Sequence, residues 1–150
     1  MLLKPIDKII YGLVVAGVAF GCFQAVVHQP KGKPPKDVAF LSASEQLETL
    51  NEWRARRRLP PLARDRELER QALETAQENA SFGRLQHGRL YGGARCEIIA
   101  ENPTGFEESI RQWDASTAGH REAIRTRKYQ KAGCACVNKR GRFYCCVRFS

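Results

Sequence analysis

Two histidines and one glutamate, His87, Glu97 and His120, have the side chains in this sequence that are best suited to chemistry. Neutral imidazole nitrogens and a carboxylate oxygen are common zinc ligands, and three protein ligands leave one coordination position for water. The same groups can transfer protons, since imidazole titrates near neutral pH. The spacing alone decides neither, and the plainer alternatives are a solvated loop histidine at His87 and a helix-packing histidine at His120.

The sequence offers no dedicated nucleophile beside these residues. It contains neither a Gly-x-Ser-x-Gly elbow nor a His-Glu-x-x-His helix. Cys96 precedes Glu97, but a cysteine in an oxidising compartment is more often bridged than reactive. Any hydrolysis would therefore depend on a water molecule activated by a metal ion, with zinc the expected cation.

Three different kinds of element must bring the three side chains together. Residues 81–95 show no periodicity and contain several glycines, which predicts a loop around His87. Residues 96–101 alternate in the manner of a strand, with Glu97 and Cys96 on opposite faces. Residues 116–125 predict a short helix carrying His120. Only the tertiary fold can unite them.

Helices and a closing hairpin account for the other segments. The capping box Ser42-x-x-Glu45 predicts a helix from 42 to about 58, and Asp65 is the expected N-cap of a second helix. A second capping box, Thr104-x-x-Glu107, predicts a third. Residues 132–150 predict a β-hairpin that turns at 138–141. This order predicts an α+β domain in which helices pack over a small sheet.

The six cysteines favour an oxidising compartment; they are Cys22, Cys96, Cys134, Cys136, Cys145 and Cys146. A Cys-x-Cys followed by Cys-Cys is an alternative zinc arrangement, but the usual Cys-x-x-Cys spacing is absent. We expect at least one disulfide from Cys134 or Cys136 to Cys145, Cys146 or Cys96. If Cys22 lies in a membrane or is removed, one of the other five is free or pairs with another chain.

An apolar segment opens the chain. Residues 9–27 are apolar except for Gln24, and as a helix they would span roughly 28 Å, close to a bilayer core. Residues 1–28 are therefore predicted to be a signal anchor or a signal peptide. Residues 29–40 read as a Pro/Lys linker, and 41–150 as the domain. The expected location is outside the cytosol, anchored or secreted.

The charge of the chain favours anionic partners. Twenty-five lysines and arginines against sixteen acidic residues give a net charge of +9. An anionic membrane surface or an acidic envelope polymer would suit this balance. Nucleic acid is not expected, because aromatic and basic residues interleave only in the last strand. A merely soluble, positively charged surface is the plain alternative.

Several of these segments together resemble the CAP superfamily of cysteine-rich secretory, venom allergen and pathogenesis-related proteins. The matching segments are Asn51-x-x-Arg54, Leu59-Pro60-Pro61-Leu62, Leu85-Gln86-His87-Gly88, Cys96-Glu97-Ile98-Ile99-Ala100 and Gly119-His120-Arg121. The resemblance covers roughly residues 45–149 and is to the short bacterial type with an SCP-like domain. It implies an α-β-α sandwich, with His87, Glu97 and His120 at the floor of a cleft.

The resemblance is incomplete around the glutamate. Cys96 and Ile98 replace the glycine and asparagine of the family pattern, and the family's second glutamate has no match, although Glu101 is a potential substitute. Two functions follow. The favoured one is a non-enzymatic binding module for a small apolar ligand, an envelope component or a protein. The alternative is a metal-dependent hydrolase that uses His87, Glu97 and His120.

Overall fold

The computed structural model describes residues 26–27 and 40–150. Its elements follow the chain in the order β1 (Val26–Val27), α1 (Ala43–Ala55), β2 (Ala63–Arg64), α2 (Arg66–Phe82), β3 (Cys96–Asn102), α3 (Phe106–Ala115), α4 (His120–Arg125), β4 (Lys131–Lys139) and β5 (Arg142–Phe149). Most of the predicted apolar segment and all but the last residue of the predicted linker lie outside this range.

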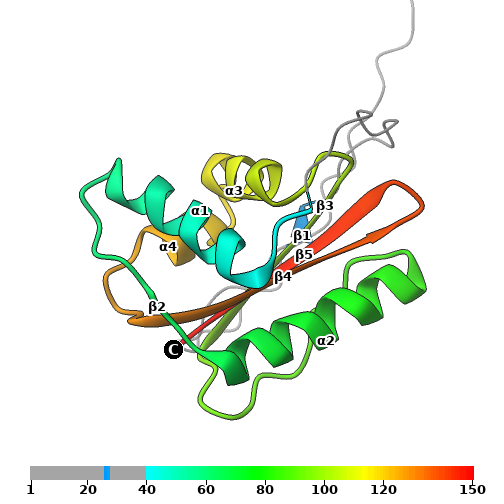
Figure 1. The fold of residues 1–150 in the computed structure, drawn as a ribbon, viewed down its shortest axis with the longest axis horizontal. Helices are drawn as coiled ribbons and strands as arrows, with labels where there is room; N and C mark the ends of the chain where they lie inside the picture. The colour runs from blue at the N-terminus through cyan, green and yellow to red at the C-terminus, as the bar shows by residue number, and fades with distance from the viewer. Residues whose placement is uncertain (1–25, 28–39) are drawn as a thin grey trace, which may run out of the picture.

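A five-stranded sheet forms the middle layer, in the order β1-β3-β5-β4-β2. The three long strands are antiparallel, while β1 runs parallel to β3 and β2 parallel to β4. Helix α2 covers one face of the sheet, and α1, α3 and α4 cover the other (Figure 1). The predicted α+β fold with an α-β-α sandwich is confirmed.

The helix starts show why these segments are helical. Ser42 and Glu45 form the predicted capping box: the Ser42 hydroxyl accepts from the Glu45 amide, and the Glu45 carboxylate accepts from the Ser42 amide at 2.7 Å. Asp65 caps α2 by accepting the amides of Glu67 and Leu68. These bonds satisfy amides that a helix leaves unpaired in its first turn.

The predicted capping box at Thr104 is wrong. Helix α3 begins after Gly105, which makes no side-chain cap. The side-chain oxygen of Asn102 instead accepts the amides of Thr104 and Gly105, at 3.0 and 2.6 Å. An asparagine at the end of a strand therefore organises this turn, as Asx residues commonly do.

The predicted hairpin is confirmed. Strands β4 and β5 turn at Arg140 and Gly141, whose φ angles are 53° and 78°. Two successive positive φ angles suit a two-residue turn that follows the twist of the strands. The alternating residues Phe143, Cys145, Val147 and Phe149 all face the core beneath α1, α3 and α4, as their spacing predicts.

Helix α2 lies unusually close to the sheet. A Cβ atom added to Gly133 on β4 would lie 2.0 Å from the Glu69 backbone nitrogen. Ala72 and Ala76, both buried, extend the same contact along α2. Small side chains on both elements thus let the two backbones approach each other, and this close packing holds α2 near the sheet.

One predicted disulfide is confirmed. Cys136 and Cys145 are opposite each other in the β4–β5 register and form a disulfide. Cys96 is disulfide-bonded as well. Cys134 and Cys146 are free thiols, buried on opposite faces of the sheet. Burial raises the pKa of both thiols, so neither is activated as a nucleophile.

The last two residues of the predicted apolar segment belong to the sheet. Val26 and Val27 pair with Ile99 and Ala100 of β3. The part of the chain that the structure describes holds no helix long and apolar enough to cross a bilayer. The predicted anchor or signal peptide otherwise lies outside the described residues.

Candidate functional site

The carboxylate of Glu97 is the centre of the site. Strand alternation in β3 points it toward α2, where it is fully buried. One oxygen accepts hydrogen bonds from Thr75 Oγ1 at 3.0 Å and Arg148 Nε at 2.7 Å. The other accepts from the Gly88 amide at 2.9 Å and contacts His87 Nδ1 at 3.0 Å. Four hydrogen bonds fill the acceptor positions that a carboxylate offers.

Arg148 is the counterion of Glu97. It lies directly opposite Glu97 in the β3–β5 register, and only 2% of its surface is exposed. Its other nitrogens donate to Gln71 Oε1 at 2.7 Å and Thr75 Oγ1 at 3.1 Å, both on α2. The guanidinium therefore links the sheet to α2, and its positive charge is paired inside the protein.

The surroundings of Glu97 keep it ionised. Burial raises the pKa of a carboxyl, but the hydrogen bond from His87 and the charge of Arg148 outweigh it, and the pKa of Glu97 falls below its usual value. An ionised carboxylate only accepts hydrogen bonds, so Nδ1 of His87 donates in this contact. Nε2 of His87 is buried and has no hydrogen-bond partner among the described residues.

The loop between α2 and β3 positions His87. Its start is fixed by Asn79, whose side-chain oxygen accepts the Gln86 amide at 2.9 Å. Gly88 then passes so close to the site that an added Cβ would lie 2.5 Å from Thr75 Oγ1 and 2.6 Å from an Arg148 nitrogen. A glycine is needed here because no side chain fits between the loop and the site.

His120 lies in a different setting. It opens α4, is fully buried, and its Nδ1 is 3.0 Å from the Ser116 hydroxyl. Its helix packs through Ala123 and Ile124 on the face of β3 opposite to the Glu97 carboxylate. The structure thus joins His87 to Glu97, while the grouping of His120 with them stays a prediction. Across residues 26–27 and 40–150, no three His, Cys, Asp or Glu side chains are arranged to hold a metal ion.

The contacts of Glu97 do not fit a zinc ligand. Its acceptor positions are filled, and an arginine nitrogen lies 2.7 Å away, where it would repel a cation. Glu101 does not replace the missing family glutamate, because its carboxylate pairs with Arg142 at 2.7 Å near the other end of β3. The three-residue zinc site stays a prediction that this geometry does not favour.

Sequence reasoning found His87 and Glu97 but missed their partners. Arg148, Thr75 and Gln71 complete the site, and none belongs to a recognisable motif. A weak signal was available in the last strand, where Arg148 is the charged residue between the apolar Val147 and Phe149. Because Arg148 is buried, it needs an acidic partner, and the pairing of β3 with β5 identifies Glu97 as that partner.

A profile of the cysteine-rich secretory protein (CAP) family matches residues 47–149. No curated protein matches the sequence.

Solved structures with this fold are distant in sequence. An outer surface protein of Borrelia burgdorferi is 19% identical with a TM-score of 0.60, over 71% of this chain and 89% of that one. An extracellular SCP-domain protein of Bacillus anthracis is 19% identical with a TM-score of 0.59, over 71% and 39%. MpPR-1i is 20% identical with a TM-score of 0.56, over 71% and 84%. At these identities the likeness establishes the fold alone.

Proposed function

Because the chain belongs to the cysteine-rich secretory protein (CAP) family, we propose that it is an extracytoplasmic binding module and not an enzyme. Its binding partner on this proposal is a small apolar ligand, an envelope or membrane component, or a protein. The His87–Glu97–Arg148 cluster serves as an internal clasp that holds the loop and α2 on the sheet.

The observation that carries this proposal is the fully bonded carboxylate of Glu97. A general base or a metal ligand needs a free lone pair directed at its target. The four hydrogen bonds to Glu97 come from α2, the loop and β5, so they consume its lone pairs on structural contacts. The hydrolase alternative loses its central group in this arrangement.

The disulfide supports a location outside the cytosol. Cross-links such as Cys136–Cys145 persist mainly in oxidising compartments. Two of the similar structures are described as an outer surface protein and an extracellular protein. Peptide mapping after thiol blocking in intact cells should find Cys136 and Cys145 joined, and alkylation of both would contradict the extracytoplasmic location.

Zinc titration of the full chain tests the non-enzymatic role. We expect no stoichiometric zinc binding that depends on Glu97, and no ester or peptide hydrolysis that depends on the two histidines. Calorimetry and hydrolysis assays on the wild type, Glu97→Gln, His87→Ala and His120→Ala provide the comparison. Circular dichroism must first show that each variant is folded, because Glu97 also stabilises the fold.

The opposite result is clearly recognisable. Zinc binding at one ion per chain, lost in His87→Ala and His120→Ala together with turnover, would overturn the binding-module proposal in favour of the hydrolase. Mass spectrometry of lipids and metals that copurify with the chain gives the positive reading, for which we expect a lipid or envelope component and no zinc.

A further inference from the structure

The two most exposed aromatic side chains lie at the same end of the domain. Phe40 is 74% exposed and Phe82 is 66% exposed. The Phe40 ring is tilted against the Phe143 ring on one face of β5, with 5.5 Å between the ring centroids. On the other face, the next residue, Tyr144, reaches the end of α2 beside Phe82, where its hydroxyl is 4.0 Å from a Cβ built on Gly83. The rings therefore flank the β4–β5 hairpin at one level.

Three cations lie at the same end of the domain. Lys139 Nζ donates to the Ser81 carbonyl at 3.0 Å, which brings the hairpin to the end of α2. The Arg84 guanidinium lies 5.8 Å from the Phe82 ring, and Arg140 occupies the hairpin turn. All three are exposed, and none pairs with a carboxylate among residues 40–150. We call this set, with Phe40 and Phe82, the hairpin end, after the end of the domain at which strands β4 and β5 turn (Figure 1).

We propose that the hairpin end docks on a bilayer surface that carries anionic headgroups. Phenyl rings at 66% and 74% exposure gain free energy by entering the interface between headgroups and acyl chains. Arginine and lysine beside them match the headgroup phosphates. A soluble polyanion would neutralise the same cations but would leave both rings in water, so the surface fits a membrane better.

The inference rests on the proposed binding role, since it names the partner, but its readout is independent of zinc and hydrolysis.

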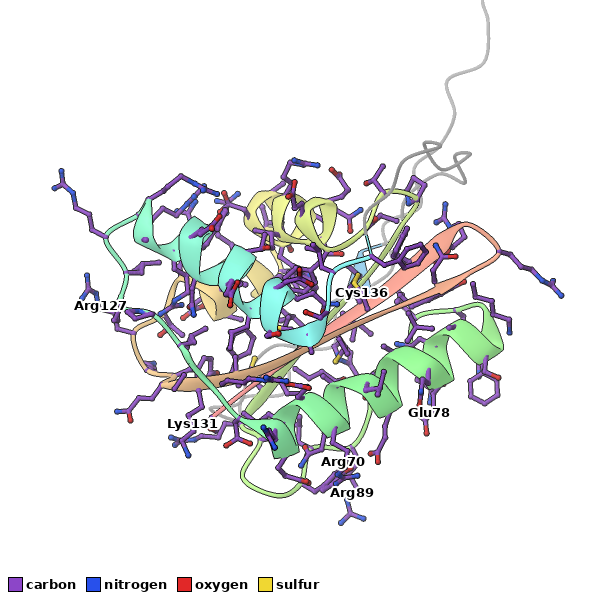
Figure 2. All side chains as sticks on the ribbon, in the orientation of Figure 1. Arg70, Glu78, Arg89, Arg127, Lys131 and Cys136 are labelled. Carbon is purple, nitrogen blue, oxygen red and sulfur yellow. A yellow bond between two sulfur atoms is a disulfide. The ribbon has the colours of Figure 1, made fainter. Side chains whose placement is uncertain are left out.

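The size of the electrostatic part follows from the number of cations. Each lysine or arginine near an anionic membrane strengthens binding roughly fivefold. Glu78, an exposed acidic residue one turn before Phe82 on α2, opposes this attraction (Figure 2). Reversing the charge of two of the three cations should still weaken docking by well over tenfold.

A tryptophan placed in the hairpin end reports docking of the full chain. Both native tryptophans, Trp53 and Trp113, are buried, which keeps the background constant. The assay uses Phe82→Trp in vesicles of phosphatidylcholine and phosphatidylglycerol with brominated acyl chains, which quench a tryptophan at the interface. The matched control is Leu73→Trp, which is also neutral and exposed on α2 but about 14 Å nearer the other end.

The expected result is strong quenching for Phe82→Trp and little for Leu73→Trp, in anionic vesicles only. The reversal Lys139→Glu with Arg140→Glu should abolish it. The same charge change at the far end of the molecule, Arg56→Glu with Lys128→Glu, should leave it in place. Vesicles of phosphatidylcholine alone control for anchoring through the apolar residues 9–27.

Three outcomes would overturn the inference. Equal quenching of the tryptophans at positions 73 and 82 would mean that no particular end docks. Quenching that survives the reversal of Lys139 and Arg140 would remove the anionic surface as the partner. A change in emission with soluble inorganic polyphosphate, without quenching by brominated lipid, would identify a polyanion in place of a bilayer.

Discussion

Replacement of Arg148 by methionine should destabilise this protein much more than the small change in side-chain volume implies. The variant keeps most of the hydrocarbon chain but removes the guanidinium. Glu97 is then buried as a charge without its counterion, and Gln71 Oε1 loses the donor that lies 2.7 Å away. Both groups are shielded from water, which cannot replace the lost contacts.

The expected cost is about 4 kcal/mol. Removing one partner of a buried ion pair typically costs about 3–5 kcal/mol. A buried acceptor left unpaired adds about 1–3 kcal/mol, while the three hydrogen bonds that Glu97 keeps, from Thr75, His87 and Gly88, reduce the total. Because domains of this size are stable by only about 5–15 kcal/mol, the loss is a large part of the whole.

Urea unfolding of the oxidised full chain measures this cost in a double-mutant cycle. Glu97→Gln, Arg148→Met and the double variant give the coupling free energy, which we expect to exceed about 2 kcal/mol. The control is Arg64→Met, which breaks an exposed pair with Glu69 and should cost below about 1 kcal/mol. A cost for Arg148→Met no larger than that of Arg64→Met, or a coupling near zero, would refute the clasp.

Three further results are expected. Ionised Glu97 contributes stability that is fully present above its unfolded-state pKa near 4.5 and is lost as the pH falls through its lower folded-state pKa. Urea unfolding at low pH should show this loss, and Glu97→Gln should make the free energy of unfolding depend less on pH. Gly133→Ala should lower the Tm by the equivalent of at least about 1–3 kcal/mol, because the added Cβ meets the Glu69 backbone; an unchanged Tm would contradict the close packing. Joint replacement of Cys136 and Cys145 by alanine should cost roughly 2–3 kcal/mol in urea unfolding, since their bridge closes a loop with a sequence separation of nine; no loss would show that the bridge does not form.

The fold was largely predictable because its local signals agree with one another. The capping box at Ser42, the N-cap at Asp65 and the alternation in the last strand each depend on neighbouring residues, which a sequence shows directly. The turn before α3 was missed because two nearby residues, Asn102 and Thr104, are both plausible caps. Only the conformation of Gly105 shows that the asparagine is the one used.

The site was predictable only in part, for a physical reason. His87 and Glu97 came from a resemblance between short segments, and the 3.0 Å contact between them agrees with it. The convergence of His120 with these two residues stays a prediction, because it depends on how the start of α4 is placed against β3, which short segments do not encode. Arg148 depended on the pairing of β3 with β5, a long-range register that no local pattern reveals.

The end of the apolar run shows the same limit. Residues 9–27 have the length and composition of a bilayer-spanning helix, yet Val26 and Val27 pair with β3. Valine suits a strand as well as an apolar helix, so a short apolar stretch is ambiguous when it is read alone.

The two-residue strands β1 and β2 cover part of each outer edge of the sheet. They occupy its two edges, so each of the long strands has a neighbour on both sides. Loss of β1, by proteolysis after Val27 together with reduction of the Cys96 disulfide, would uncover the backbone of Ile99 and Ala100, the β3 residues that it pairs with. An open edge of this kind readily adds a strand from another molecule. A domain that has lost β1 would therefore be prone to self-association through this edge.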